Sequence, residues 1–280
     1  MNQKYNFVFM GTDQFACLVL DYLDQAGVRP TLIITVPDRP AGRKLILTPP
    51  PVKVWATEHE LPVLQPANLK DLDLNTLDTK YDLAVVASYG QLIPTKILDF
   101  FQRRVLNIHP SLLPRYRGAT PLESAILAGD SETGVTIMEI DENMDHGPIL
   151  DQTKIPLTNQ DYFTLRREAA EAGAQLLAEV VPRYLEGRLK PVAQDHPAAT
   201  YTKKITKAEG ELNLSDDPLL NYRQIRAYVD WPGTYFFVDK NGKRQRVIIK
   251  QAHLEAGQLI IDRVLPEGKK EMSWEEFSDR

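Results

Sequence analysis

Short apolar runs alternate with helically spaced apolar positions along the first part of the chain. The first run ends at Gly11 and leads into helical spacing, which is typical of a buried strand followed by a helix. Repeated along the chain, this alternation predicts an α/β fold with an open, mostly parallel sheet covered by helices on both faces. The predicted strands span residues 5–10, 31–36, 83–87, 105–108 and 135–140, and the predicted helices span about 13–26, 51–60, 121–128 and 161–187.

The pattern changes after residue 189. Residues 190–205 combine prolines with polar positions and are expected to form a linker. Beyond this segment β-like stretches replace the helical spacing, and Asn241-Gly242 between two of them is a hairpin signal. We therefore expect a larger α/β domain over residues 1–189 and a small β-rich domain over residues 206–280. The β-like stretches cover 235–238, 246–250 and 258–264.

The composition is that of an average globular protein, with 43% hydrophobic and 25% charged residues in a chain of 280. The single cysteine, Cys17, lies in an apolar helical stretch, so we expect a buried thiol and a reducing, cytoplasmic compartment. No apolar run approaches the length of about 18 residues that a membrane span needs, and no leader pattern precedes the first strand.

The net charge of −5 results from 33 basic and 38 acidic residues and argues against a nonspecific nucleic-acid coater. The charge is unevenly distributed, however. Residues 201–280 carry a net charge of +1, and within 239–250 five basic residues accompany one acidic residue. A nucleic acid held at local basic surfaces therefore stays compatible with the sequence.

The common cofactor motifs are missing from the sequence. Only Gly11 stands where a dinucleotide fingerprint needs three glycines, so a tight strand-to-helix turn explains this glycine better. P-loop, zinc-ligand and Gly-x-Ser-x-Gly patterns are also missing, and we expect no metal site.

The richest segment for chemistry includes the end of the strand predicted at 105–108. Asn107 and His109 are two positions apart, so they would point to the same side of a strand end. An imidazole can take or give a proton near neutral pH, and an amide can donate a hydrogen bond to a developing oxyanion. Alternatively, the two side chains could have a purely structural role and form hydrogen bonds with the backbone of a stiff loop.

A second polar turn lies between two strand-like stretches within residues 134–151. It contains Asp145, whose carboxylate could orient a nearby imidazole and stabilise its positive charge. Capping the turn is the commoner role for such an aspartate. His146 is expected to be an exposed turn residue and is a minor candidate for chemistry.

Taken together, these elements resemble the signature of the folate-dependent formyltransferase family. The resemblance is carried by Asn107-x-His109, the Ser111-Leu112-Leu113-Pro114-x-x-Arg117-Gly118 loop and Asp145, in this order. Further matches to the methionyl-tRNA formyltransferase branch run along nearly the whole chain. They include Phe9-Met10-Gly11-Thr12, Val85-Val86-Ala87-x-Tyr89-Gly90-Gln91 and Trp231-Pro232-Gly233-Thr234.

The resemblance implies a Rossmann-like formyltransferase fold followed by a small OB-like domain. It also implies transfer of a formyl group from N10-formyltetrahydrofolate to the methionine amine of initiator methionyl-tRNA, for translation initiation. The catalytic residues would be Asn107 as oxyanion donor, His109 as proton carrier and Asp145 as the group that orients His109.

The resemblance implies where the two substrates bind. The folate would lie against two loops, and Gly90 would allow close approach of the backbone to a flat pterin. The residues of these loops are Val86, Tyr89 and Gly90, together with Ser111, Leu112, Leu113 and Pro114.

A Pro-rich basic loop over residues 37–51 could contact acceptor-stem phosphates, or it could be an ordinary solvated loop. The basic residues within 240–250 are expected to face one way, and the protein is expected to be a monomer. The expected tRNA contacts are Arg39, Arg43, Lys44, Lys204, Lys207, Lys243, Arg244 and Arg246.

Two features depart from the family pattern. The β-rich region is shorter than the family's barrel domain, so it could be open or lack strands, and His146 stands where a small polar residue is expected. A sugar-nucleotide N-formyltransferase with the same donor and catalytic residues is the alternative function. A catalytically silent RNA-binding module is a third hypothesis, and the intact catalytic set argues against it.

Overall fold

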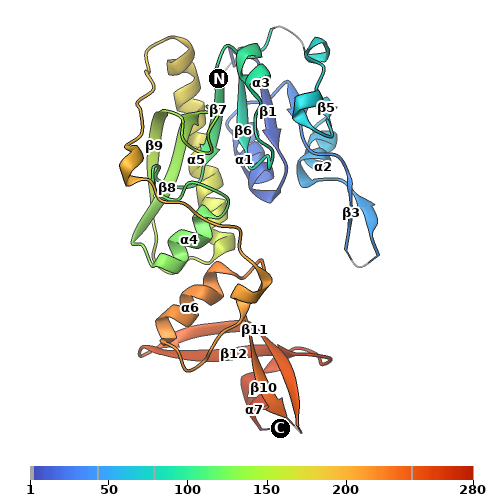
Figure 1. The fold of residues 1–280 in the computed structure, drawn as a ribbon, viewed down its shortest axis with the longest axis vertical. Coiled ribbons are helices and arrows are strands. Elements are labelled where there is room, and N and C mark those ends of the chain that lie inside the picture. The colour runs from blue at the N-terminus through green and yellow to red at the C-terminus, as the bar shows by residue number, and fades with distance from the viewer. Residues whose placement is uncertain (1–2, 43, 78–79, 241, 280) are drawn as a thin grey trace. The chain divides into compact units, whose positions relative to one another are not determined.

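The computed structural model describes residues 3–42, 44–77, 80–240 and 242–279 (Figure 1). The chain divides into two compact units, whose boundaries differ from those predicted at residues 189 and 206. The difference arises because two stretches of the first 189 residues pack with the C-terminal part. The first unit comprises Met1–Gly118, Gly134–Ile155 and Arg166–Tyr201, and the second comprises Ala119–Thr133, Pro156–Leu165 and Thr202–Arg280.

The first unit is built on a seven-stranded sheet with the order β5-β2-β1-β6-β7-β8-β9 (Figure 1). The strands from β5 to β7 are parallel, and β8 pairs antiparallel with β7. The strands are β1 (Phe7–Gly11), β2 (Leu32–Ile34), β5 (Val63–Leu64), β6 (Leu83–Ala87), β7 (Val105–His109), β8 (Glu132–Glu139) and β9 (Ile149–Pro156). The helices are α1 (Gln14–Gln25), α2 (Pro51–Glu58), α3 (Thr95–Phe100) and α5 (Tyr162–Leu185).

The centre of this sheet is fully apolar. Every residue of β1 and β6 is buried, as expected for strands covered on both faces. The thiol of Cys17 on α1 is buried too, and burial together with the carboxylates of Asp21, Asp13 and Glu58 raises its pKa to about 12. The predicted buried thiol is therefore confirmed.

The predicted α/β fold is confirmed, and each strand and helix predicted within residues 1–189 occurs close to its expected bounds. A two-stranded hairpin within the Pro-rich basic loop was not predicted. Its strands are β3 (Arg39–Ala41) and β4 (Ile46–Thr48), which pair antiparallel. All residues of the two strands are exposed, so the hairpin lacks the regular pattern of buried apolar positions from which a strand is predicted.

The second unit contains a four-stranded antiparallel sheet with the linear order β10-β11-β12-β13. This open sheet confirms the β-rich region, whereas helix α6 (Pro218–Ala227), which packs against α4 (Pro121–Ala128) and against β11 and β12, was not predicted (Figure 1). The strands are β10 (Tyr235–Lys240), β11 (Lys243–Glu255), β12 (Gln258–Pro266) and β13 (Met272–Ser273), and α7 (Trp274–Ser278) follows them. None of the helices that the structure describes combines the length and apolar character of a membrane span.

Residues 190–201, predicted as part of a linker, are bound to the first unit by their backbone. Val192 and Ile149 exchange two N–H···O hydrogen bonds of 2.7 and 2.8 Å. The N–H of Arg117 donates to the carbonyl of Thr200 at 2.9 Å, and the N–H of Thr200 donates to the carbonyl of Pro114 at 3.2 Å. Prolines and polar residues mark the segment as irregular, but they do not reveal which loops its backbone will pair with.

Candidate active site

The candidate catalytic residues lie at the carboxyl edge of the parallel strands. Strand β7 ends at His109, and Asn107 within it pairs with Val86 of β6. Residues 110–118 follow β7 as a loop, and residues 140–148, here called the Asp145 turn, connect β8 to β9. This is the edge at which open α/β sheets bind ligands.

The Asp145 carboxylate reaches both polar residues of β7. Its Oδ1 lies 3.7 Å from Nδ1 of His109 and 3.5 Å from Nδ2 of Asn107. Its Oδ2 accepts a hydrogen bond of 2.7 Å from the N–H of Gly118. The structure therefore brings together the three residues predicted as the catalytic set.

His109 is oriented by a backbone carbonyl. Its side chain is 5% exposed, and its Nε2 lies 3.0 Å from the carbonyl oxygen of Tyr116. Because a carbonyl can only accept, Nε2 carries the hydrogen, and the lone pair of the neutral imidazole is on Nδ1. The nitrogen that can take a proton therefore faces Asp145, whose charge stabilises the imidazolium that proton uptake creates.

Asn107 completes a set suited to acyl-type transfer. Its side chain is half-buried at the strand end, and its hydrogen bond to Asp145 is long at 3.5 Å. The amide therefore has a hydrogen that it can donate to a ligand oxygen that gains negative charge. An imidazole that can transfer a proton and an amide that can donate to an oxyanion are two groups that favour attack on a carbonyl carbon.

The 110–118 loop is held by side-chain hydrogen bonds that the sequence did not reveal. The Ser111 hydroxyl donates to the carbonyl of Arg115 at 2.6 Å, and the Thr136 hydroxyl donates to the carbonyl of Ser111 at 2.6 Å. Gln152 Nε2 donates to the carbonyl of Leu113 at 2.9 Å and to the Thr136 hydroxyl at 2.8 Å. The loop is therefore a rigid corner that keeps the end of β7 in place.

The first group of predicted folate contacts is only partly accessible. Ser111 and Leu113 are buried, whereas Leu112 and Pro114 are half-buried. The Ser111 hydroxyl is already engaged within the loop. Leu112 and Pro114 are therefore the two side chains of this group that can offer surface to a ligand.

The second group of predicted folate contacts offers backbone rather than side chains. Val86 and Tyr89 are buried, and burial raises the pKa of Tyr89 to about 12. The Tyr89 carbonyl accepts a hydrogen bond of 2.7 Å from the Thr12 hydroxyl. Gly90 has a φ of 78°, and a Cβ added to it would meet nothing within 4 Å. The backbone at Gly90 therefore borders open space at the carboxyl end of β6.

The predicted basic loop is the exposed β3–β4 hairpin. Arg39 and Lys44 are exposed, whereas Arg43 lies outside the described residues. Sequence reasoning missed that the same hairpin presents apolar side chains, with residues 45–47 exposed by 63–71%. The hairpin thus offers both positive charge and apolar surface to a partner.

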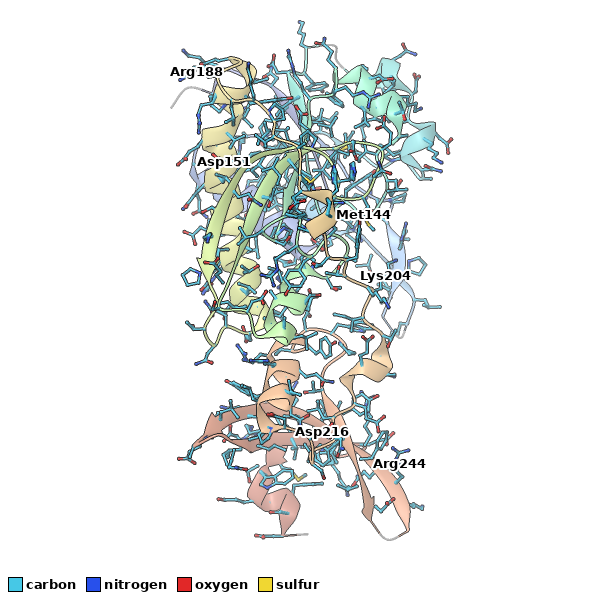
Figure 2. The ribbon with its side chains drawn as sticks, turned by 60° about the vertical axis from the view of Figure 1, so that its left-hand side comes forward. Met144, Asp151, Arg188, Lys204, Asp216 and Arg244 are labelled. Atoms are coloured by element: carbon cyan, nitrogen blue, oxygen red, sulfur yellow. The ribbon has the colours of Figure 1, made fainter. Side chains whose placement is uncertain are left out.

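The basic residues of the second unit do not share one face. Arg244 and Arg246 lie on one face of β11, and their guanidinium groups stack on aromatic rings of β10. The Cζ of Arg244 lies 3.9 Å from the ring centroid of Phe237, and the Cζ of Arg246 lies 3.7 Å from that of Tyr235. Side chains alternate along a strand, so Lys243 points to the opposite face. The prediction that the basic residues within 240–250 face one way is therefore wrong. Lys204 and Lys207, the remaining predicted contacts in this unit, are exposed, and Lys204 and Arg244 are labelled in Figure 2.

His146 is half-buried, so the prediction of an exposed turn residue is wrong. Its Nδ1 lies 2.6 Å from Oδ2 of Asp141, and its ring stacks on that of His196 with centroids 4.0 Å apart. Glu142, Asn143 and Met144 are exposed in this turn, and Met144 is labelled in Figure 2. His146 is therefore occupied by contacts within the first unit.

Two buried polar residues had no predicted role. The side chains of Arg117 and Gln194 are buried and hydrogen-bonded to each other. Arg117 belongs to the loop that carries the family resemblance, so the sequence did contain a signal that this residue has a role. Gln194 had no local signal, because its partners are 47 to 77 residues away in the sequence.

Within the described ranges, no three His, Cys, Asp or Glu side chains lie together as a metal ion would need.

Comparison with known sequences places the chain among formyl transferases. The Formyl transferase family model matches residues 4–181. A methionyl-tRNA formyltransferase from Halalkalibacterium halodurans is 41% identical over 243 residues, which cover 86% of this chain and 76% of that protein. The methionyl-tRNA formyltransferase of Chloroflexus aggregans is 46% identical over 233 residues, which cover 82% and 75%.

Solved structures share the fold. A methionyl-tRNA formyltransferase from Clostridium thermocellum matches with a TM-score of 0.61 at 17% identity, covering 94% of this chain and 98% of that chain. A sugar 3N-formyl transferase, solved with dTDP and 5-N-formyl-THF, matches with a TM-score of 0.63 at 18% identity, covering 96% and 100%. At these identities the likeness shows a common fold and does not distinguish between acceptor substrates.

Proposed function

This chain belongs to the methionyl-tRNA formyltransferase family, and we propose that it formylates the methionine amine of initiator methionyl-tRNA, with N10-formyltetrahydrofolate as donor. The product would serve translation initiation. The observation that carries the proposal is the juxtaposition of Asn107, His109 and Asp145 at the carboxyl edge of the sheet. The sugar-nucleotide alternative has weaker support, because the sugar formyltransferases are similar to this chain only at 17–20% identity.

The proposed chemistry forms one bond and breaks another. A folate-type donor supplies a formyl carbon, to which the amine nitrogen bonds while the bond from that carbon to the folate nitrogen breaks. Nδ1 of His109 takes the proton that the amine loses and then gives it to the departing nitrogen. The catalyst therefore ends the reaction in the protonation state in which it began, with Nε2 bonded to Tyr116 throughout.

Asn107 and Asp145 stabilise the two charges that develop. The Asn107 amide donates to the formyl oxygen as it becomes negative, and one such donor is typically worth about 3 kcal/mol. The Asp145 carboxylate stabilises the imidazolium of His109 across 3.7 Å. For two unit charges at this separation, an effective dielectric constant of about 20 gives about 4 kcal/mol.

The loops beside this set fit a flat, folate-type donor. The backbone at Gly90 borders open space, because a Cβ there would meet nothing within 4 Å. Val86, shortly before Gly90, pairs with Asn107 on the neighbouring strand. A pterin could pack against this backbone and against Leu112 and Pro114. In that position it would lie close to the side-chain amide of Asn107.

Acceptor binding is proposed for the exposed basic residues. Arg39 and Lys44 would contact phosphates of the acceptor stem, and the apolar tip at residues 45–47 would lie against unstacked bases. In the second unit, the exposed Lys204, Lys207 and Lys243 and the stacked Arg244 and Arg246 are further candidates.

A comparison of acceptors tests the proposed function. The purified protein is supplied with N10-formyltetrahydrofolate and either charged initiator tRNA or a dTDP-linked amino sugar. Formyl-methionyl-tRNA is expected as the product, whereas formylation of the sugar nucleotide alone would overturn the proposal. His109→Ala should abolish most of the activity.

A matched histidine variant separates chemistry from general damage. His253→Ala removes an imidazole that pairs with Asp262 at 2.9 Å in the second unit. This variant should retain the wild-type rate, because its imidazole takes no part in the proposed reaction.

A further inference from the structure

Gln194 lies in the 190–201 segment and uses its whole hydrogen-bonding capacity behind the candidate catalytic set. Its side chain is 6% exposed. Its Nε2 donates to the carbonyls of Asp145 and Gly147 at 2.9 and 2.7 Å. Its Oε1 accepts from Nε and Nη2 of Arg117 at 3.1 and 2.7 Å. Both donors and both acceptor positions of the amide are therefore engaged.

The donor half of Gln194 holds a turn that is unfavourable by itself. Asp145 has a φ of 51°, a conformation that residues other than glycine adopt rarely and that persists only when surrounding contacts enforce it. Gly147 is packed so closely that a Cβ there would lie 2.0 Å from the carbonyl oxygen of Glu139. The two hydrogen bonds from Gln194 fall on both sides of His146, and they fix the backbone that presents the Asp145 carboxylate.

The acceptor half of Gln194 holds the loop that contacts His109 and Asp145. Arg117 is 1% exposed. The residue before it, Tyr116, accepts from Nε2 of His109, and the residue after it, Gly118, donates to Oδ2 of Asp145. A fixed Arg117 therefore fixes both neighbours. Through Arg117, Gln194 also acts on the orientation of His109.

We propose that Gln194 is a positioning residue for formyl transfer, which sets Asp145 at its working distance from His109. The inference rests on the proposed function. Gln194 acts through the backbone of the Asp145 turn and through Arg117, and its own four hydrogen bonds leave it no group for substrate. The predicted linker thereby becomes part of the catalytic apparatus.

Gln194→Glu separates positioning from folding. A glutamate keeps the acceptor oxygens that pair with Arg117, so the buried guanidinium retains a partner. It removes both donors and places oxygen opposite the carbonyls of Asp145 and Gly147. We expect kcat to fall by about 10- to 100-fold, as for other residues that orient a catalytic group, while KM for both substrates stays within about threefold.

A double-mutant cycle tests whether Gln194 acts through Asp145. In the Asp145→Asn background, Gln194→Glu should lower kcat by less than about threefold, because the group that it positions is already lost. A merely structural role would give the full loss again, and this additive result would overturn the inference. A wild-type kcat for Gln194→Glu in the native Asp145 background would overturn it as well.

Two further variants keep the result interpretable. Gln194→Met fills a similar volume without hydrogen bonds and releases Arg117 as well, so in the native Asp145 background it should lower kcat at least as much as Gln194→Glu; it replaces Gln194→Glu in that single-variant test if the glutamate variant does not fold, and a wild-type kcat would again overturn the inference. Asn221→Ala is the matched control, because Asn221 is a buried amide of the second unit that donates to the carbonyl of Asn213 at 2.9 Å. It should lower the melting temperature and leave kcat unchanged. Wild-type protein that does not formylate methionyl-tRNA would refute the proposed function instead, so the two failures are distinguishable.

Discussion

Replacing Asp145 with asparagine removes one charge and leaves the shape of the side chain. In the wild-type protein the carboxylate lies 3.7 Å from Nδ1 of His109, with the two side chains only 15% and 5% exposed. At an effective dielectric constant of about 20, two unit charges at this separation interact by about 4 kcal/mol. Because the imidazolium exists only after His109 has taken the proton, the substitution removes this energy from the transition state and leaves the energy of the ground state, in which His109 is neutral, unchanged. We therefore expect Asp145→Asn to lower kcat by roughly 10³-fold with little change in KM.

Single-turnover formation of formyl-methionyl-tRNA measures this loss directly, because the assay reports the chemical step without product release. Asp141→Asn is the matched control, since it removes a carboxylate from the same turn that pairs with His146 at 2.6 Å and not with His109. The control should retain a rate within about threefold of wild type. A folded Asp145→Asn variant that loses less than tenfold would refute the reasoning, because the carboxylate would then contribute almost nothing to the charged imidazole.

Three other outcomes follow from the same structure. Asn107→Ala should lower kcat by about 10²- to 10³-fold through loss of the oxyanion donor, measured in the same single-turnover assay, and an unchanged kcat would contradict that role. Burial raises the pKa of the Cys17 thiol to about 12. The thiol should therefore resist alkylation by iodoacetamide at pH 8 in the native protein and react after unfolding, which mass spectrometry would detect. Rapid labelling of the native protein would contradict the burial of this thiol. The double substitution Arg39→Ala with Lys44→Ala should raise KM for the tRNA and leave KM for the folate unchanged. The slope of log binding constant against log salt concentration should become less steep by about 2, because two phosphate contacts are lost. An unaltered slope would show that the hairpin is not part of the tRNA site.

The sequence predicted those parts of the fold that depend on local burial. Strands β1 and β6 are continuous apolar runs because both faces are covered, and the run itself reveals them. The β3–β4 hairpin and helix α6 lack that signature. The hairpin is wholly exposed, and α6 buries few of its positions, so neither shows a strong apolar period.

The candidate site shows the same limit at the level of single residues. Asn107 and His109 were predicted to be close because they share one strand, and the family resemblance added Asp145. The positions of Gln194 and Arg117 could not be predicted, because their hydrogen bond joins residues 77 positions apart. A segment rich in proline and polar residues looks like a linker whether its backbone is solvated or bound. The hydrogen bonds from Nε2 of Gln194 to the carbonyls of Asp145 and Gly147 connect this segment with the Asp145 turn.

The single-turnover rate of formyl-methionyl-tRNA formation by His109→Ala, compared with that of wild type, tests the central claim most directly. The account predicts that wild-type protein transfers the formyl group from N10-formyltetrahydrofolate and that the folded variant is about 10²- to 10⁴-fold slower, because the proton carrier is missing. A folded His109→Ala variant with a rate within tenfold of wild type would contradict proton transfer by His109.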